Sequence, residues 1–434
     1  MKNLFKKIIT KILIIESKLV LRKYKPKIIA ITGTVGKTST KDAVYSVLKH
    51  FYFIRKSDKS YNSEIGIPLT ILGCPNGWGS PSVWLSNIWH GVTVIFSRKP
   101  YPEWLVLETG VSKPGDMEAI TQFIIPDIVI VTRFSEAPVH VEFFKSPAHL
   151  IEEKSKLMKA LKASGTLILN ADDSDVLALK QKTKNKTVTY GFSEDATLSA
   201  SHEQIMYDME GYNKKPQGIS FKVNYEGSSL PVIMNGVFSK NFIYAGLAAL
   251  AVARDLDLDM LKAIEGLSSY ESSPGRLKLI EGLKESLIID DTYNSSPIAC
   301  EAALETLNDM EVSGSKIAVL GDMLELGKFS PEAHKKIGEV AAGFGVDFLV
   351  TVGKRAHGIA EGALAIGMPA KKIFQFEDSR SAGKFIEQMI KPGDMILIKG
   401  SQGTRMERAV LEVMAHPEDR EKLLVRQEEE WQRR

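Results

Sequence analysis

Short apolar runs alternate with longer amphipathic stretches along most of the chain. The first runs predict buried β-strands at 27–32, 104–108, 127–132 and 166–170. A second series of strand-like runs covers 287–290, 316–321, 348–353, 373–376 and 395–400. Because strands that alternate with helices are typical of parallel sheets, the pattern predicts an α/β protein. We expect a central doubly wound domain followed by a C-terminal Rossmann-like α/β domain.

The pattern changes at places that divide the chain. Segments 219–225 and 230–234 predict antiparallel strands within the first series. The stretch 272–275, made of serine, proline and glycine, predicts a hinge between the two series. We therefore expect three parts: an N-terminal helix over 1–26, a central domain over 27–275 and a C-terminal domain over 276–434. The highly charged residues 417–434 predict an exposed terminal helix or a frayed tail.

The N-terminal helix is the most basic part of the chain. Residues 1–27 carry a charge of +8, whereas the whole chain carries +3, so the remainder carries −5. One side of the helix is apolar, with Phe5, Ile8, Ile12, Ile15 and Leu19 at helical spacing. The helix is either in peripheral contact with an anionic membrane through residues 1–25, or packed on the next domain with its lysines in water. Its longest apolar run, 12–15, is far shorter than the roughly 20 residues of a membrane span.

Composition excludes several classes of protein. Of the 434 residues, 44% are hydrophobic and 25% are charged, which is ordinary globular usage and not that of a disordered or fibrous chain. The two cysteines cannot form a disulfide framework or a cysteine-based zinc site, and this fits a reducing cytoplasm. No secretory cleavage site and no base-reading motif accompany the basic helix. We therefore expect a cytoplasmic protein that does not bind nucleic acid.

A glycine-rich turn joins the first predicted strand to a helix. Its sequence, GTVGKTS, covers residues 33–39. The backbone N–H groups of such a turn surround phosphate oxygens, and the helix N-terminus adds partial positive charge. Lys37 would neutralise the β- and γ-phosphates of a nucleotide, and the Thr38 hydroxyl would ligate Mg²⁺. The turn predicts a phosphate-binding loop, or P-loop, whose contacts with the nucleotide come from Gly33, Thr34, Gly36, Lys37, Thr38 and Ser39.

Two further polar residues follow predicted strands. Glu108 ends the strand at 104–108, so its carboxylate is expected at the carboxyl edge of the sheet, where it can hold Mg²⁺. The alternative is a glutamate that is merely solvated at a strand end. His140 lies eight residues after Thr132, the end of the third strand. A lone histidine of this kind is more often structural than functional.

Nine segments, in order along the chain, match one enzyme family. They are ITGTVGKTST (31–40), YNSEIGIPLTIL (61–72), VLETGVSKPGDM (106–117), VHVEFF to EEKSKL (139–157), LILNADD (167–173), PGRL (274–277), IIDDTYNSSP (288–297), AVLGDMLELG (318–327) and LIKGSQGTRME (397–407). They resemble the Mur ligases, the ATP-dependent amide-forming enzymes of peptidoglycan synthesis. The DDTYN and LGDMLELG segments are most similar to the members that add D-alanyl-D-alanine.

The resemblance implies a role for each matching residue. Four residues are expected in catalysis: Lys37, His140, Lys154 and Arg276. Four are expected to hold one or two Mg²⁺ ions: Thr38, Glu108, His140 and Lys154. Lys154 is the position at which this family commonly carries a carbamylated lysine, and Arg276 would meet the ATP phosphates. Asp291 would bind the ribose, while Tyr293 and Asn294 lie in a loop close to the nucleotide.

The chain departs from the family pattern at several places. Arg133 stands after the third strand, where relatives have an asparagine. The segment on the adenine side, SKNF at 239–242, lacks the usual histidine, so adenine recognition is expected to differ. About 27 residues precede the P-loop strand, where relatives carry a domain that grips the UDP-sugar. We therefore expect this N-terminal sugar-binding domain to be lacking.

The resemblance implies a ligase whose central domain binds ATP. The expected substrates are small peptides and amino sugars: D-Ala-D-Ala and a muramyl tripeptide precursor. One alternative is a Mur-type ligase with another acceptor, such as a lipid-linked one. A second is a catalytically inactive ATP-binding partner protein. A third, a P-loop kinase or GTPase, accounts for residues 31–40 and leaves the other segments unexplained.

Overall fold

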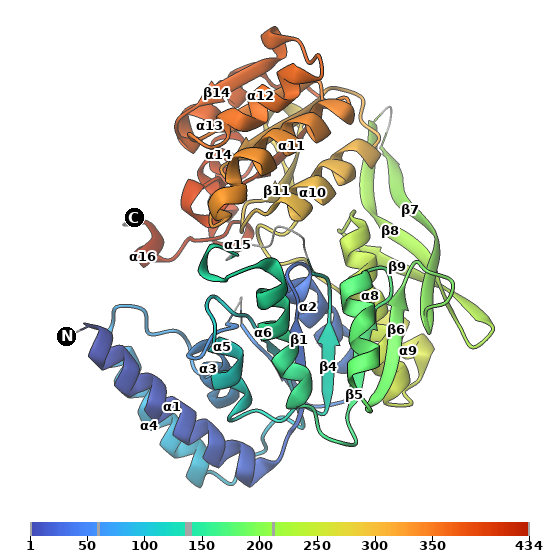
Figure 1. The fold of residues 1–434 in the computed structure, drawn as a ribbon. Helices are drawn as coiled ribbons and strands as arrows, with labels where there is room; N and C mark the ends of the chain where they lie inside the picture. Colours follow the sequence, from blue (N-terminus) through green and yellow to red (C-terminus); the bar gives the residue numbers. More distant parts are fainter. Residues whose placement is uncertain (1, 59–60, 135–140, 211–212, 433–434) are drawn as a thin grey trace.

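The α/β architecture predicted from the sequence is confirmed, with one sheet in each of two stacked domains (Figure 1). The computed structural model describes residues 2–58, 61–134, 141–210 and 213–432. The central domain holds a nine-stranded sheet and the C-terminal domain a six-stranded sheet. Both described ends of the chain lie on the left of the view in Figure 1. The second sheet begins with β10 (Lys278–Glu281), just after the predicted hinge.

The central sheet has the order β2-β3-β1-β4-β5-β6-β7-β8-β9. Its pairs are parallel as far as β7, and β7, β8 and β9 are antiparallel. The strands are β1 (Lys27–Thr32), β2 (Ile54–Lys56), β3 (Trp104–Glu108), β4 (Ile128–Val131), β5 (Thr166–Asn170), β6 (Lys186–Gly191), β7 (Leu198–Glu210), β8 (Asn213–Tyr225) and β9 (Ser228–Asn235). β1 lies between β3 and β4 and is buried from Ile28 onward, which explains its unbroken apolar run.

Helices cover both faces of the central sheet and give it two hydrophobic cores. One core includes residues of α2 (Lys37–Leu48), α8 (Lys240–Asp255) and α9 (Met260–Ser268). The other includes residues of α1 (Lys2–Tyr24), α3 (Gly66–Leu72), α4 (Pro81–Phe96), α5 (Asp116–Thr121), α6 (Pro147–Lys159) and α7 (Ser174–Leu177). Alanines keep α8 slender, so it is buried along most of its length against α2.

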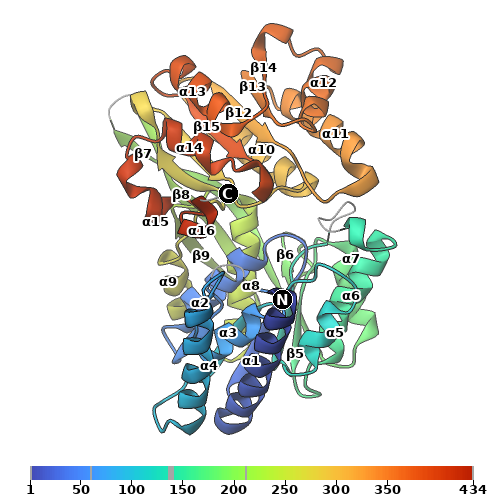
Figure 2. The ribbon, with the colours of Figure 1, turned by 90° about the vertical axis from the view of Figure 1, so that its left-hand side faces the viewer.

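The N-terminal helix α1 packs on the central domain beside α3 and α4 (Figure 2). Ile9, Leu13 and Val20 form its buried side. The apolar stripe predicted from the sequence lies elsewhere on the helix, and Ile8 and Ile15 of that stripe are about half exposed, at 49% and 59%. The helix therefore has two apolar sides, of which only one enters the core. Within the described part of the chain, no helix is long and apolar enough to cross a membrane.

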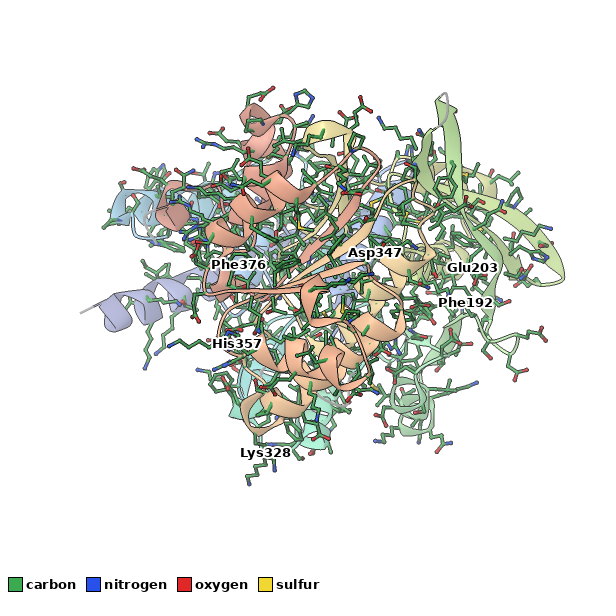
Figure 3. All side chains as sticks on the ribbon, turned by 90° about the horizontal axis from the view of Figure 1, so that it is seen from above. Phe192, Glu203, Lys328, Asp347, His357 and Phe376 are labelled. Atoms are coloured by element: carbon green, nitrogen blue, oxygen red, sulfur yellow. The ribbon has the colours of Figure 1, made fainter. Side chains whose placement is uncertain are left out.

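The C-terminal sheet has the order β10-β11-β15-β12-β13-β14, with β10 antiparallel and the other pairs parallel. Its further strands are β11 (Leu287–Asp291), β12 (Lys316–Gly321), β13 (Phe348–Val352), β14 (Ile373–Phe376) and β15 (Met395–Lys399). Its helices are α10 (Pro297–Asp309), α11 (Ser330–Gly343), α12 (His357–Ala365), α13 (Ser379–Met389), α14 (Glu407–Val413), α15 (Arg420–Leu423) and α16 (Glu429–Gln432). Seen from above, Asp347 and Phe376 mark this domain, while Phe192 and Glu203 mark the β6–β7 side of the central domain (Figure 3).

Two extensions link the domains away from the hinge. The long hairpin of β7 and β8 rises beside the C-terminal domain (Figure 1). There the backbone N–H of Glu311 donates to the Tyr207 hydroxyl at 2.8 Å, and Lys215 pairs with Glu281. The second extension is the chain end, where the Trp431 ring meets Trp78 of the central domain edge-on, with 6.2 Å between ring centroids.

The C-terminal segment from residue 417 is anchored to the domain and is not a frayed tail. Arg426 is buried and donates to Glu407 and to the carbonyl of Thr292, both at 3.0 Å. Leu424 is buried in the core of the C-terminal domain. The high charge of this segment predicted exposure to solvent, but the buried Arg426 has a carboxylate partner, Glu407, inside the fold.

Candidate active site

The turn between β1 and α2 has the form of a phosphate-binding loop. Gly33 and Gly36 have φ angles of 143° and 85°, which residues with side chains rarely adopt. A Cβ atom on Gly33 would lie 2.0 Å from the Thr132 hydroxyl oxygen, so glycine is needed for the close approach to the end of β4. The backbone N–H of Thr34 donates to the carbonyl of Arg133 at 2.6 Å and holds the loop there. The N-terminus of α2 consequently opens at the carboxyl edge of the sheet.

Two lysine side chains converge on this loop. The Nζ atom of Lys37 donates to the carbonyls of Gly33 and Thr34 at 3.0 and 3.2 Å. From α6, the Nζ atom of Lys154 donates to the Gly33 carbonyl and to the Thr34 hydroxyl, both at 3.0 Å. Burial lowers the pKa of both amines, and repulsion from Lys37 lowers the pKa of Lys154 further, to well below its usual range.

A carboxylate lies beside the two lysines. Glu108 ends β3 and is 1% exposed, as the position predicted for it implies. Its Oε2 atom accepts from the Thr38 hydroxyl at 2.9 Å, and its Oε1 atom accepts from the Asn62 amide at 3.0 Å. These contacts orient both carboxylate oxygens. Attraction from Glu108 also opposes the fall in the pKa of Lys37.

Arg276 brings a third cation to the loop from the other side of the hinge. Its Nη2 atom donates to the Thr38 hydroxyl at 3.3 Å. Its guanidinium lies 4.0 Å from the centroid of the Tyr293 ring. The buried Nε atom has no hydrogen-bond partner, although most buried donors in proteins do. The guanidinium is therefore held in place and keeps a donor available.

The segment predicted as a hinge, residues 272–275, lies along the P-loop helix. The Ser273 hydroxyl donates to Asp42 of α2 at 2.9 Å, and Asp42 also pairs with Lys56 at 2.6 Å. The Tyr270 hydroxyl is hydrogen-bonded to Ser39. Together with the Arg276 contact to Thr38, these bonds tie the linker to the first turns of α2. The position of the linker is thereby set by the same helix that begins at the P-loop.

Asp291 lies apart from these groups. Its carboxylate pairs with the buried Lys399 of β15 at 2.5 Å and accepts from the Leu277 N–H at 3.3 Å. Lys399 also donates to the carbonyl of Asn294 at 3.0 Å, so this ion pair supports the loop that follows β11. Next to it, burial raises the pKa of Asp290 to about 7, against the opposing effect of hydrogen bonds from Thr292. In this structure Asp291 supports the site from behind and does not line the cavity.

A cavity of about 880 Å³ lies between the domains, over the P-loop. It is lined by residues of both domains and by Lys6 and Thr10 of α1. Most of the predicted site residues lie on its wall: Gly33, Thr34, Gly36, Lys37, Thr38, Ser39, Glu108, Lys154, Arg276, Tyr293 and Asn294. The volume and the polar lining are sufficient for a nucleotide and a second substrate.

The sequence prediction did not single out several lining residues. Asn62 belongs to the YNSEIG segment, whose match offered the only signal. Glu325 reaches the cavity from a loop of the C-terminal domain, and Trp431 reaches it from the chain end. Lys6 and Thr10 could not be found from the sequence, because nothing in the helical pattern of α1 indicates which end meets a cleft.

The donors available for a metal ion are oxygen atoms. The predicted ligand His140 lies outside the described residues. Among those that the structure describes, no group of three or more His, Cys, Asp or Glu side chains could hold a metal ion. Thr38 and Glu108 nevertheless fit Mg²⁺, which prefers oxygen ligands and commonly binds through one or two carboxylates, phosphates and water. The site therefore suits a magnesium ion that arrives with a nucleotide.

Comparison with known families gives two matches that together span most of the chain. The Mur ligase middle domain matches residues 31–80 and 91–253, and the glutamate ligase domain of Mur ligases matches residues 275–402. The chain is 28% identical over 401 residues to the UDP-N-acetylmuramoyl-tripeptide–D-alanyl-D-alanine ligase of Bacillus subtilis (strain 168), covering 92% of this chain and 79% of that protein. It is 27% identical to the Escherichia coli (strain K12) protein of the same name, covering 88% and 76%.

Solved structures show the same fold. The MurF ligase from Thermotoga maritima in complex with ADP superposes with a TM-score of 0.74 at 25% identity, covering 95% of this chain and 84% of that one. MurF from Acinetobacter baumannii superposes with a TM-score of 0.75 at 23% identity, covering 92% and 78%.

Proposed function

The chain belongs to the Mur ligase family, and we propose that it uses ATP to join D-alanyl-D-alanine to a muramyl tripeptide precursor. One observation carries the proposal: a P-loop lysine, an oriented glutamate and an arginine from across the hinge meet on one cavity between the domains. This arrangement neutralises charge where a phosphate and a carboxylate must meet. The matches to ligases that act on UDP-N-acetylmuramoyl-tripeptide supply the substrate class.

The reaction has two steps. A substrate carboxylate attacks the γ-phosphorus of ATP, which gives an acyl phosphate and releases ADP. The amine of the second substrate then attacks the acyl carbon, and the tetrahedral intermediate loses phosphate and a proton to give the amide. Lys37 and Arg276 would stabilise the charge on the transferred phosphoryl group. Closure about the hinge would keep water away from the acyl phosphate.

Thr38 and Glu108 would hold Mg²⁺, and Asn62 would keep the glutamate oriented. When bound, the ion neutralises phosphate charge and polarises the phosphoryl oxygens. Arg276 contacts the same threonine hydroxyl, so the cation from the second domain and the metal ligand are adjacent. In the proposed reaction, Arg276 would therefore have to be in position before the nucleotide can react.

Lys154 is well placed to be carbamylated. Reaction with CO₂ needs a neutral amine: the nitrogen attacks the carbon of CO₂ and loses a proton, which leaves an anionic carbamate. Burial and the neighbouring Lys37 lower the pKa of Lys154 and so favour the neutral amine. The carbamate would place an anion beside Lys37 where the amine now stands, and it could ligate a second Mg²⁺. Mass measurement of the intact protein with and without bicarbonate tests this modification.

A coupled assay of ADP release tests the reaction. With muramyl tripeptide substrate, D-Ala-D-Ala and Mg²⁺, we expect ADP release that requires both substrates, and an amide product by mass spectrometry. Lys37→Ala should abolish both signals, and Lys180→Ala, which changes an exposed lysine that does not line the cavity, serves as the control. ADP release without amide formation would indicate a kinase, and no release with any muramyl peptide would refute the proposed reaction.

Location is a separate matter. The homologous ligases and the polar cavity support an enzyme that acts on small molecules. A peripheral contact of residues 1–25 with a membrane is supported by the apolar side of α1 that stays outside the core. Such a contact would place the enzyme at the membrane surface and would not change the reaction.

A further inference from the structure

Helices α1 and α4 share an exposed apolar surface on the outside of the central domain. On α4, the side chains of Leu85, Trp89 and Phe96 are 64%, 73% and 80% exposed. They recur at spacings of four and seven residues, so they share one side of the helix, opposite the buried Trp84 and Gly91. On α1, Ile8, Ile15 and Leu19 are between 42% and 59% exposed. We call these six residues the outer apolar face.

The two helices lie in contact and run in the same direction (Figure 2). Midway along them, a Cβ atom on Gly91 would lie 2.2 Å from Glu16 Oε2, so the glycine allows α4 to approach α1 closely. At their ends, the Tyr24 hydroxyl donates to the Ser97 carbonyl at 2.9 Å. Because the pair is fixed at both places, the six apolar residues form a rigid platform and not a loose flap. Single exposed apolar residues are ordinary, whereas a contiguous group marks an interaction surface.

The charges around this face are of one sign. Lys7, Lys11, Lys18 and Arg22 are exposed along a second side of α1 at helical spacing. The one acid of α1 is Glu16, which is buried, and α4 contains no acidic residue. Apolar residues beside a row of cations are complementary to the headgroups and outer acyl region of an anionic bilayer. A second copy of this chain would bring the same cations against each other.

The face is also continuous with the mouth of the cavity. Lys6 and Thr10 of α1 line the cavity, and Ile8 lies between them on the outer side of the same two turns. Both helices begin at this end, where Trp78, just before α4, contacts Trp431 of the cavity wall. A surface that receives the outer apolar face would therefore lie next to the edge of the cavity that α1 forms with the exposed Lys6.

We propose that the outer apolar face of α1 and α4 docks on an anionic lipid bilayer and holds the mouth of the cavity at the lipid headgroups. The docking does not depend on catalysis. The inference that docking brings the cavity to its substrate rests on the proposed ligase function. The enzyme would then meet a diphosphate-linked muramyl peptide at the bilayer surface, whether the diphosphate is carried by a lipid or by a soluble nucleotide.

Vesicle flotation of the full chain tests the docking. Wild type is expected to float with vesicles of phosphatidylcholine and phosphatidylglycerol, and not with phosphatidylcholine alone. The double variant Trp89→Ser/Phe96→Ser should lose binding by about tenfold or more, because it removes the two most exposed rings. Lys11→Glu/Lys18→Glu should weaken binding to the anionic vesicles by about fivefold or more for each lysine replaced. This loss of binding should be smaller at high salt. Leu261→Ser/Ile366→Ser, which changes exposed apolar residues on other surfaces, is the matched control.

Unchanged flotation of the Trp89→Ser/Phe96→Ser variant, or wild-type binding indifferent to phosphatidylglycerol, would overturn the proposal. The proposal would also be overturned if wild type formed a concentration-dependent dimer and Trp89→Ser/Phe96→Ser abolished it. A second copy of the chain would then occupy the outer apolar face. ADP release is measured for each variant with soluble substrate and should stay at the wild-type rate. With acceptor incorporated in the vesicles, the same variant should be slower than wild type. If wild type and all variants failed to release ADP while wild type still floated with the vesicles, the proposed ligase function would be refuted and the docking would stand.

Discussion

Glu16 provides a direct test of how α1 is held. Its side chain is 5% exposed, its Oε2 atom has no hydrogen-bond partner, and Gly91 of α4 lies against it. Burial raises the pKa of this carboxyl from 4.5 to about 7. A rise of that size corresponds to an anion destabilised by about 3 kcal/mol in the folded protein. We expect Glu16→Gln, which has the same shape without the charge, to be more stable than wild type above pH 7.

The sign of the pH dependence follows from the direction of the pKa change. The folded protein holds this proton more tightly than the unfolded chain, so stability is fully present below about pH 4.5. It falls as the pH rises toward 7, by up to about 3 kcal/mol, and is level above that. The variant lacks this slope. At pH 8 it should be more stable by about 2–3 kcal/mol, and near pH 4.5 the two proteins should be nearly equal.

Urea unfolding at several pH values, followed by tryptophan fluorescence, measures this difference. Glu361→Gln, which alters an exposed glutamate on α12, is the control and should show no comparable pH-dependent gain. The reasoning would be refuted if Glu16→Gln raised the free energy of unfolding equally at pH 5 and pH 8. It would also be refuted if wild type were more stable than the variant at pH 8. Such a result would mean that the carboxylate has a partner or a route to water.

Three other substitutions have defined outcomes. Gly33→Ala should lose nucleotide binding in a calorimetric titration, because its Cβ atom would collide with Thr132, and a soluble variant that binds ATP normally would contradict this. Glu108→Gln should raise the Mg²⁺ concentration needed for half-maximal ADP release, by about tenfold or more, while an unchanged Mg²⁺ dependence would remove Glu108 from the metal site. Ser273→Ala should weaken the hinge contact with Asp42 by about 1 kcal/mol and raise the KM for ATP, with Ser193→Ala as control.

The sequence predicted the parts of the site that are local in the chain. The P-loop is a single turn, so its glycines predict its backbone shape and its lysine predicts phosphate binding. Glu108 was placed correctly at the sheet edge because strand ends in a parallel sheet share one side. The ionised groups that surround the loop could be matched one by one to a family, yet their mutual distances could not be read from the sequence.

Other features depended on contacts between distant segments. Asp291 pairs with Lys399, over a hundred residues away, so its carboxylate supports the loop behind the cavity. On α1, Ile8 and Ile15 of the predicted apolar stripe remain exposed. The side of the helix with Leu13 and Val20 packs against the domain beside α3 and α4 instead. The pattern alone could not choose between two apolar sides of one helix.

The amino-acid sequence by itself determined the alternation of strands and helices, the phosphate loop and the family. Each of these is encoded within a few neighbouring residues, where backbone geometry and side-chain periodicity act directly. Only the tertiary structure decided that Arg276 reaches Thr38 across the hinge, that Lys154 loses its ordinary basicity beside Lys37, and that α4 supplies half of an exposed apolar face. Burial and charge proximity are properties of the packed chain, and no local pattern contains them.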